Sequence, residues 1–368
     1  MDTPVLISHK TAWLVHHAPQ DLVQSVAKRD YKIGVQGLST QQRIARIRQA
    51  LTDCGIPSSM LATIDISVVF AFERIRTSGV ACHVIGQNLP YDHIDELTPG
   101  IFITDEAFTF ALAAEWMDRI EHLEYGYEVC GDYRMGLQPS EPYTEQPATT
   151  SKDQIVEILD QHPGKPGVTR ARLALRHIYD HSASPMESAS AIALSLPVSE
   201  GGLGVRGIEL NKPLEIPKNL WHCTKARTLK IDAFITYQRK ELGIEYKGGF
   251  HNDDERKGAD AEREAILAQM GYRIITLTSA QFASQLAFHR AMNGIREALG
   301  MPRCTDAEYQ RKQNELRKHS SATGRVRRTQ GCLSSSAACR SPRQNVYITL
   351  QKRQFSTSLE ADVHVWNL

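Results

Sequence analysis

The sequence contains no long apolar run and no excess of either charge. No run approaches the about 18 residues of a membrane helix, and the first residues, MDTPVLISHK, lack the pattern of a signal peptide. We therefore expect a cytoplasmic protein without a membrane partner. Lys and Arg number 43 against 42 Asp and Glu, with a formal net charge of +1. Any surface that binds nucleic acid must therefore be basic locally, because the chain as a whole is not.

Cysteine is scarce and scattered, and no pair is spaced as CxxC. The odd number argues against a disulfide framework and favours a reducing compartment, and the spacing argues against a zinc site. The motif GxxxxGK[ST] is also absent, which excludes a P-loop nucleotide site. The seven cysteines are Cys54, Cys82, Cys130, Cys223, Cys304, Cys332 and Cys339.

The chain has 368 residues, of which 41% are apolar and 23% charged. This length predicts about two globular domains. Residues 134–150, RMGLQPSEPYTEQPATT, contain three prolines and no apolar period, so we interpret them as a linker between an N-terminal domain, 1–133, and a second domain, 151–300. Between Arg303 and Arg343 ten Lys and Arg face three Asp and Glu, so residues 301–368 are predicted to be a basic, disordered tail.

The N-terminal region alternates strand and helix patterns, which predicts a smaller α/β domain of unknown role. Ser39 begins a helix with a capping box, and strand-like runs follow at Ile64–Phe70, Val80–Ile85 and Ile101–Thr104. A buried helix is expected from Asp105 to Met117.

The most informative stretch, LKIDAFITYQRKELGIEYKGGFH, runs from Leu229 to His251. It predicts two strands, joined by a polar connection from Gln238 to Gly243. Asp232 lies on the first strand, and Glu245 and Lys247 lie on the second. Because side chains alternate along a strand, Glu245 and Lys247 share a face, and the hairpin can bring Asp232 to the same face.

This group of side chains suits hydrolysis of a phosphodiester. Asp232 and Glu245 offer the hard oxygen ligands that Mg²⁺ prefers, and a bound ion can activate a water. Lys247 can neutralise charge on the scissile phosphate or help to deprotonate the water. The alternative is an exposed hairpin face with a surface ion pair, which would contribute little to stability.

The flanking segments predict helices and one more strand. Ser184-Pro185-Met186-Glu187 is a strong helix start, so Glu187 is expected to cap its own helix. A site role is compatible with this, because a carboxylate in the first turn can also face a metal across the sheet. After the hairpin, a helix from Asp254 to Met270 and a strand from Tyr272 to Leu277 imply a parallel crossover. Thr278 then caps a last helix that ends near Leu299. The predicted fold class is α/β (α+β), with a mixed central sheet and flanking helices.

The segments SPMES (184–188), KIDAF (230–234), IEYKGGFH (244–251) and DAEREAILAQMGYRIITLT (260–278) together resemble the PD-(D/E)XK nuclease superfamily. More narrowly, residues 184–300 resemble a domain related to very short patch repair endonucleases. The resemblance implies a restriction-endonuclease-like fold. The residues 6–19, LISHKTAWLVHHAP, resemble abortive-infection antitoxin-like proteins.

The resemblance also implies roles for particular residues. Asp232 and Glu245 would hold Mg²⁺ or Mn²⁺, Lys247 would be the catalytic lysine and Glu187 a supporting carboxylate. His251 would be a catalytic histidine, with an ordinary loop residue as the alternative.

Two arginines of the helix that follows the hairpin are further candidates. Arg256 and Arg263 could hold DNA phosphates bidentately, and the alternative is surface pairing with Asp260 or Glu264.

We therefore expect a metal-dependent endonuclease that acts on DNA in defence or repair, with a protein partner as a further option for the N-terminal domain. The alternative is a non-catalytic module that binds nucleic acid or a partner on a nuclease scaffold, because fold does not imply function.

Overall fold

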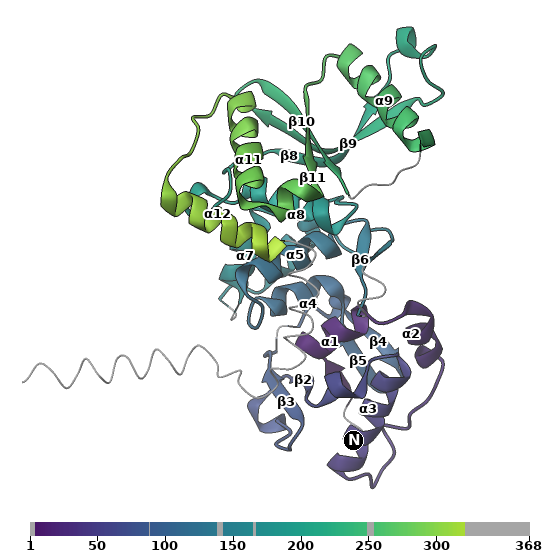
Figure 1. The fold of residues 1–368 in the computed structure, drawn as a ribbon. Helices are drawn as coiled ribbons and strands as arrows, with labels where there is room; N and C mark the ends of the chain where they lie inside the picture. The colour runs from purple at the N-terminus through teal and green to yellow at the C-terminus, as the bar shows by residue number, and fades with distance from the viewer. Residues whose placement is uncertain (1–3, 88, 138–142, 165–166, 249–253, 321–368) are drawn as a thin grey trace, which may run out of the picture. The chain divides into compact units, whose positions relative to one another are not determined.

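Short apolar strands of the first part of the chain pair into a five-stranded mixed sheet, in the order β3-β2-β1-β5-β4 (Figure 1). β1 pairs in parallel with β5 and antiparallel to β2, while β2 and β3 are parallel and β4 and β5 antiparallel. The computed structural model describes residues 4–87, 89–137, 143–164, 167–248 and 254–320. The strands are β1 (Val5–Ile7), β2 (Ile64–Val68), β3 (Val80–Val84), β4 (Ile94–Thr98) and β5 (Ile101–Thr104).

The helices of this part follow the sequence signals. In α3 the Ser39 hydroxyl accepts from the backbone N–H of Gln42, and the Gln42 side chain accepts from the Ser39 N–H, which confirms the capping box. Its buried residues Ile44, Ile47 and Leu51 join a core with the strands. The helices are α1 (His9–His16), α2 (Gln20–Ala27) and α3 (Thr40–Asp53), with short 3-10 helices at Ser58–Leu61, Ala71–Glu73 and Tyr91–His93.

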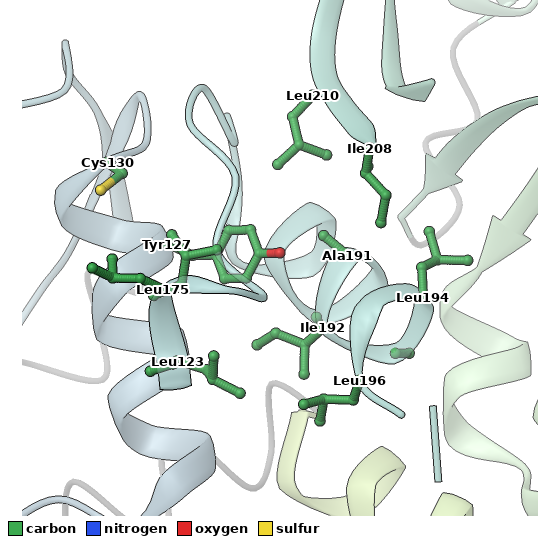
Figure 2. Close-up of a cluster of buried hydrophobic side chains, with 14 of the residues drawn as sticks. Leu123, Tyr127, Cys130, Leu175, Ala191, Ile192, Leu194, Leu196, Ile208 and Leu210 are labelled. Atoms are coloured by element: carbon green, nitrogen blue, oxygen red, sulfur yellow. The ribbon is translucent and has the colours of Figure 1, made fainter. Parts of the chain in front are cut away.

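A second, larger core begins with the next helices. Figure 2 shows Tyr127 of α5 beside Ile192 of α8, with Ile208 and Leu210 of the following strand nearby. This core also takes in side chains of the second sheet and of the last helices. The elements are α4 (Glu106–Ala113), α5 (Arg119–Val129), β6 (Tyr133–Met135), β7 (Tyr143–Glu145), α6 (Lys152–Gln161), α7 (Val168–Leu175) and α8 (Pro185–Ser195), with a 3-10 helix at Val198–Glu200.

Along the chain, the buried residues of the first apolar core end at Ile103 and those of the second core begin at Ala107. This change lies before the linker expected at 134–150. Helices α4 and α5 bury their apolar side chains with α6, α7 and α8, so they belong to the second core although they come before that segment. Within the segment, β6 and β7 pair antiparallel as a small two-stranded sheet. The prolines of this stretch therefore do not mark where the cores divide.

The second sheet has four strands in the order β11-β10-β9-β8. β9 pairs antiparallel with β8 and β10, and β10 pairs in parallel with β11, which confirms the expected hairpin and the parallel pair after it. The mixed α/β class with mixed sheets and flanking helices is therefore confirmed. The elements are β8 (Ile208–Glu215), β9 (Thr228–Tyr237), β10 (Lys240–Lys247), α9 (Asp254–Gln269), β11 (Ile274–Thr278), α10 (Ser279–Ala283) and α11 (Gln285–Leu299), with a 3-10 helix at Lys218–Leu220.

The hairpin turn is shorter than the connection expected from Gln238 to Gly243. Only Gln238 and Arg239 form it, with φ of 45° and 68°, as a two-residue hairpin turn with positive φ at both positions requires. Gly243 lies inside β10 instead. A Cβ there would come within 2.4 Å of Ile274 Cδ1, so this glycine permits close packing between β10 and β11.

The expectation of a tail without structure from residue 301 is wrong for its first part. Residues Ala307–Ser320 form helix α12. Its Tyr309 and Leu316 are buried, and Gly201 lies so close to the α12 backbone that a Cβ on it would be 2.5 Å from the Gln313 nitrogen. These few apolar side chains suffice to pack a helix that is otherwise highly charged. The rest of the predicted tail, 321–368, lies outside the described residues. No helix within the described ranges is long and apolar enough to cross a bilayer.

Candidate functional site

The hairpin places the two predicted metal ligands beside each other. Ile244 of β10 pairs with Ala233 of β9, so the next residues in register are Glu245 and Asp232, which occupy facing positions on adjacent strands. Asp232 Oδ2 accepts a hydrogen bond from the Tyr246 backbone nitrogen at 2.8 Å. The carboxylate of β9 is therefore fixed against the strand that carries Glu245 and Lys247.

Glu187 has one of the two compatible roles expected for it, as a cap of its own helix. It lies in the first turn of α8, where its Oε2 accepts from the Ala183 backbone nitrogen at 2.9 Å and its Oε1 from the Ser184 hydroxyl at 2.9 Å. These bonds make it a cap of its own helix. Burial raises the pKa of Glu187, and the negative charge of Asp232 adds to the effect, so this carboxylate lies within electrostatic reach of the hairpin.

All three carboxyl groups have raised pKa values. Burial is the largest cause for each, and it raises the pKa of Glu245 to about 7, with the charge of Asp232 adding to the effect. Burial and the charge of Asp232 likewise raise the pKa of Glu187, and burial raises that of Asp232 itself. A nearby cation stabilises the ionised form of carboxyl groups whose charge is disfavoured by burial.

Helix α9 supplies the cations and anions that face the hairpin. Arg263 Nη2 lies 2.6 Å from Glu245 Oε1, and Arg263 also donates to the backbone carbonyl of Lys230. Lys247 Nζ lies 2.8 Å from Glu264 Oε1 and 3.4 Å from Asp260 Oδ2, contacts that raise its pKa. The alternative expected for Arg263, pairing with Asp260 or Glu264, is therefore not what the structure has.

Side chains of α9 pair with both the predicted metal ligand of β10 and the predicted catalytic lysine of the same strand. Glu245 and Lys247 emerge from the same strand, as expected, but each is paired with a side chain of α9 and not with the other. Arg263 occupies a position in which its positive charge favours the ionised form of Glu245 and lowers its pKa, although burial has the larger, opposite effect. A metal ion held by Glu245 would have to compete with this guanidinium.

Asn211 is a site residue that the sequence reasoning missed. Its Nδ2 donates to Glu187 Oε2 and to the His181 carbonyl, both at 2.7 Å. The β8–β9 register pairs Leu210 with Ala233 and then Lys212 with Ile231, so Asn211 lies across from Asp232. Its φ is 47°, a conformation that asparagine tolerates better than most residues. The sequence feature that could have indicated this residue is a single asparagine within the strand pattern IELNKPLE.

The donor chemistry fits a hard divalent cation, although the ligands are engaged elsewhere. Two adjacent carboxylates are enough protein ligands for Mg²⁺, which keeps several waters and takes further oxygens from substrate. Among the described residues, no group of three or more His, Cys, Asp or Glu side chains has the arrangement of a metal site. His251 and the side chain of Arg256 lie outside the described residues, so their predicted roles stay predictions.

Comparison of the chain with protein-family models, with curated proteins and with solved structures gave no match. The functional argument therefore depends on the geometry and electrostatics of the site.

Proposed function

We propose that this protein is a Mg²⁺-dependent endonuclease that cleaves DNA, with a second domain of restriction-endonuclease-like type. The observation that carries the proposal is the adjacency of Asp232 and Glu245 on β9 and β10, with Lys247 on the same strand face as Glu245. The raised pKa values of Glu187, Asp232 and Glu245 support it, because burial disfavours their ionised forms and a divalent cation would stabilise these forms.

In this proposal the site residues have different roles. Asp232, oriented by the Tyr246 N–H, and Glu245 would hold the metal. When bound, Mg²⁺ supplies Lewis acidity and an activated water. Lys247 would exchange its contacts with α9 for the scissile phosphate. The side chains of Lys247 and Glu264 are 43% and 60% exposed, so breaking this ion pair costs little. Glu187 would support the site, and His251 would act as base or as acid for the leaving group.

Plasmid nicking with Mg²⁺ or Mn²⁺ tests the proposal. We expect Asp232→Ala and Lys247→Ala to lower the rate at least about 100-fold, the scale of a lost catalytic group. Glu262→Ala is the matched control, because Glu262 is an exposed acid on the same helix, α9. Equal activity of the wild type, Asp232→Ala and Lys247→Ala would contradict the proposal.

One observation favours a second candidate, a non-catalytic module that binds nucleic acid or a partner. Arg263 already neutralises Glu245, and Lys247 is paired with α9, so the carboxylates could serve only to hold the helix. In that case no cleavage would occur with either metal. DNA binding would instead survive the double substitution Asp232→Ala and Glu245→Ala.

A further inference from the structure

The connection from β8 to β9, together with the first three residues of β9, is basic in a chain that is otherwise balanced. Residues 216–230, IPKNLWHCTKARTLK, hold four Lys or Arg and no Asp or Glu, whereas the whole chain has 43 and 42. We call this segment the basic loop. Its cations are all exposed, and they are Lys218, Lys225, Arg227 and Lys230.

These four cations have no carboxylate partner in the described part of the chain. The Arg227 guanidinium donates to the backbone carbonyls of the preceding residues and lies 4.5 Å from the centre of the Trp221 ring. Lys218 Nζ lies 6.0 Å from the same ring. Neither carbonyls nor a ring removes a positive charge, so the loop presents its cations to solvent.

Hydrogen bonds and buried apolar side chains hold the basic loop in one conformation. Trp221 Nε1 donates to the Ile216 carbonyl at 2.8 Å, and the Ile216 nitrogen donates to the Arg227 carbonyl at 2.9 Å. Ile216 and Leu220 are buried in a small cluster with Ile266 of α9. The cations therefore project from a preformed surface, which reduces the entropy lost when a ligand binds.

The basic loop continues into the candidate site. Lys230 and Asp232 are two apart on β9, so they point to the same side of the strand. Arg263 joins the two regions, because it donates both to the Lys230 carbonyl and to Glu245. A polyanion bound along the loop would therefore extend toward the carboxylates.

We propose that the basic loop binds the phosphate backbone of duplex DNA and leads it to Asp232 and Glu245. That the bound DNA reaches Asp232 and Glu245 rests on the proposed function, whereas the binding of DNA by the basic loop does not. Backbone contact fits better than base stacking, because Arg227 covers one face of Trp221, the exposed aromatic ring of the loop. Exposed Lys and Arg that neutralise phosphates give an affinity that depends steeply on salt.

The test compares the full chain with two double variants by fluorescence anisotropy on a labelled 20-base-pair duplex, in EDTA so that no cleavage occurs. Lys218→Gln with Arg227→Gln removes two loop cations. The matched control, Arg74→Gln with Arg76→Gln, removes two exposed cations of the first part of the chain. For the loop variant the slope of log K against log salt should fall in magnitude by about 2, and affinity at 0.1 M salt should fall about tenfold or more.

An unchanged slope in the loop variant, or an equal loss in the control, would overturn the proposal. Tighter binding of a 20-nucleotide single strand than of the duplex would overturn the assignment to duplex DNA. Cleavage by the wild type in Mg²⁺ is scored separately. If the loop variant binds DNA normally and the wild type cleaves it, only the role of the basic loop is contradicted. If the loop variant loses DNA binding and the wild type does not cleave DNA, only the proposed nuclease activity is contradicted.

Discussion

Replacing Arg263 with alanine should increase the affinity of the protein for Mg²⁺. Arg263 Nη2 lies 2.6 Å from Glu245 Oε1, and the two side chains are 32% and 14% exposed. A bound cation must displace this guanidinium from a predicted ligand. The substitution removes the competitor and leaves both carboxylates in place.

The size of the effect follows from the burial of the ion pair. Exposed pairs contribute about 0.2–1 kcal/mol, and hydrogen bonds to charged groups about 1.5–3 kcal/mol. A partly buried pair with one short contact falls between these ranges, at about 1.4 kcal/mol. Because about 1.4 kcal/mol corresponds to a factor of ten, Arg263→Ala should bind Mg²⁺ about tenfold more tightly.

The pH of the measurement matters, because the metal binds the ionised form of Glu245. The pKa of Glu245 is about 7 with Arg263 present, and Arg263 lowers it, so the substitution will raise it further. The gain in affinity should therefore be largest at pH 8.5 and should shrink at pH 6, where Glu245 is protonated in the variant.

Isothermal titration with Mg²⁺, without DNA, measures this prediction. Arg263→Lys keeps the positive charge and should show a smaller gain. Arg290→Ala removes an exposed arginine of α11 and should show none. Glu245→Gln should abolish the Mg²⁺ signal. Equal or weaker binding by Arg263→Ala at pH 8.5 would refute the idea that Arg263 competes for the metal position.

Two further predictions concern stability. Burial lowers the pKa of His9 to about 3 and that of His122 to about 4. Acid therefore protonates these side chains in the unfolded chain first, and stability is lost as the pH falls below about 6.5. Each of these two histidines should lower the free energy of unfolding by about 2 kcal/mol between pH 7 and pH 5, as measured from urea midpoints. His122→Gln, which keeps a donor for the Phe110 carbonyl, should lose less between these pH values than the wild type, and an equal loss would contradict the assignment. Gly201→Ala should destabilise more than Gly204→Ala by at least about 1 kcal/mol. Both have positive φ, but only Gly201 faces the α12 backbone, so equal urea midpoints would argue against that packing.

Elements whose signals are local could be predicted from the amino-acid sequence. Capping boxes at Ser39 and Thr278 fix helix starts through hydrogen bonds within four residues. The apolar strands around Asp232 and Glu245 predicted the hairpin, and the order of hairpin, helix and strand predicted the parallel pair of β10 and β11. These features depend on neighbours along the chain, so a pattern of a few residues suffices to predict them.

Contacts between side chains of different elements depend on the tertiary fold. No local pattern could assign Arg263 to Glu245, because they are 18 residues apart and Asp260 or Glu264 on the same helix were equally available partners. Asn211, which has a positive φ within β8, donates to Glu187 of α8, 24 residues earlier in the chain. Helix α12 packs through a few buried side chains within a charged sequence. Such contacts depend on distance in space, which the fold sets and the order of residues does not reveal.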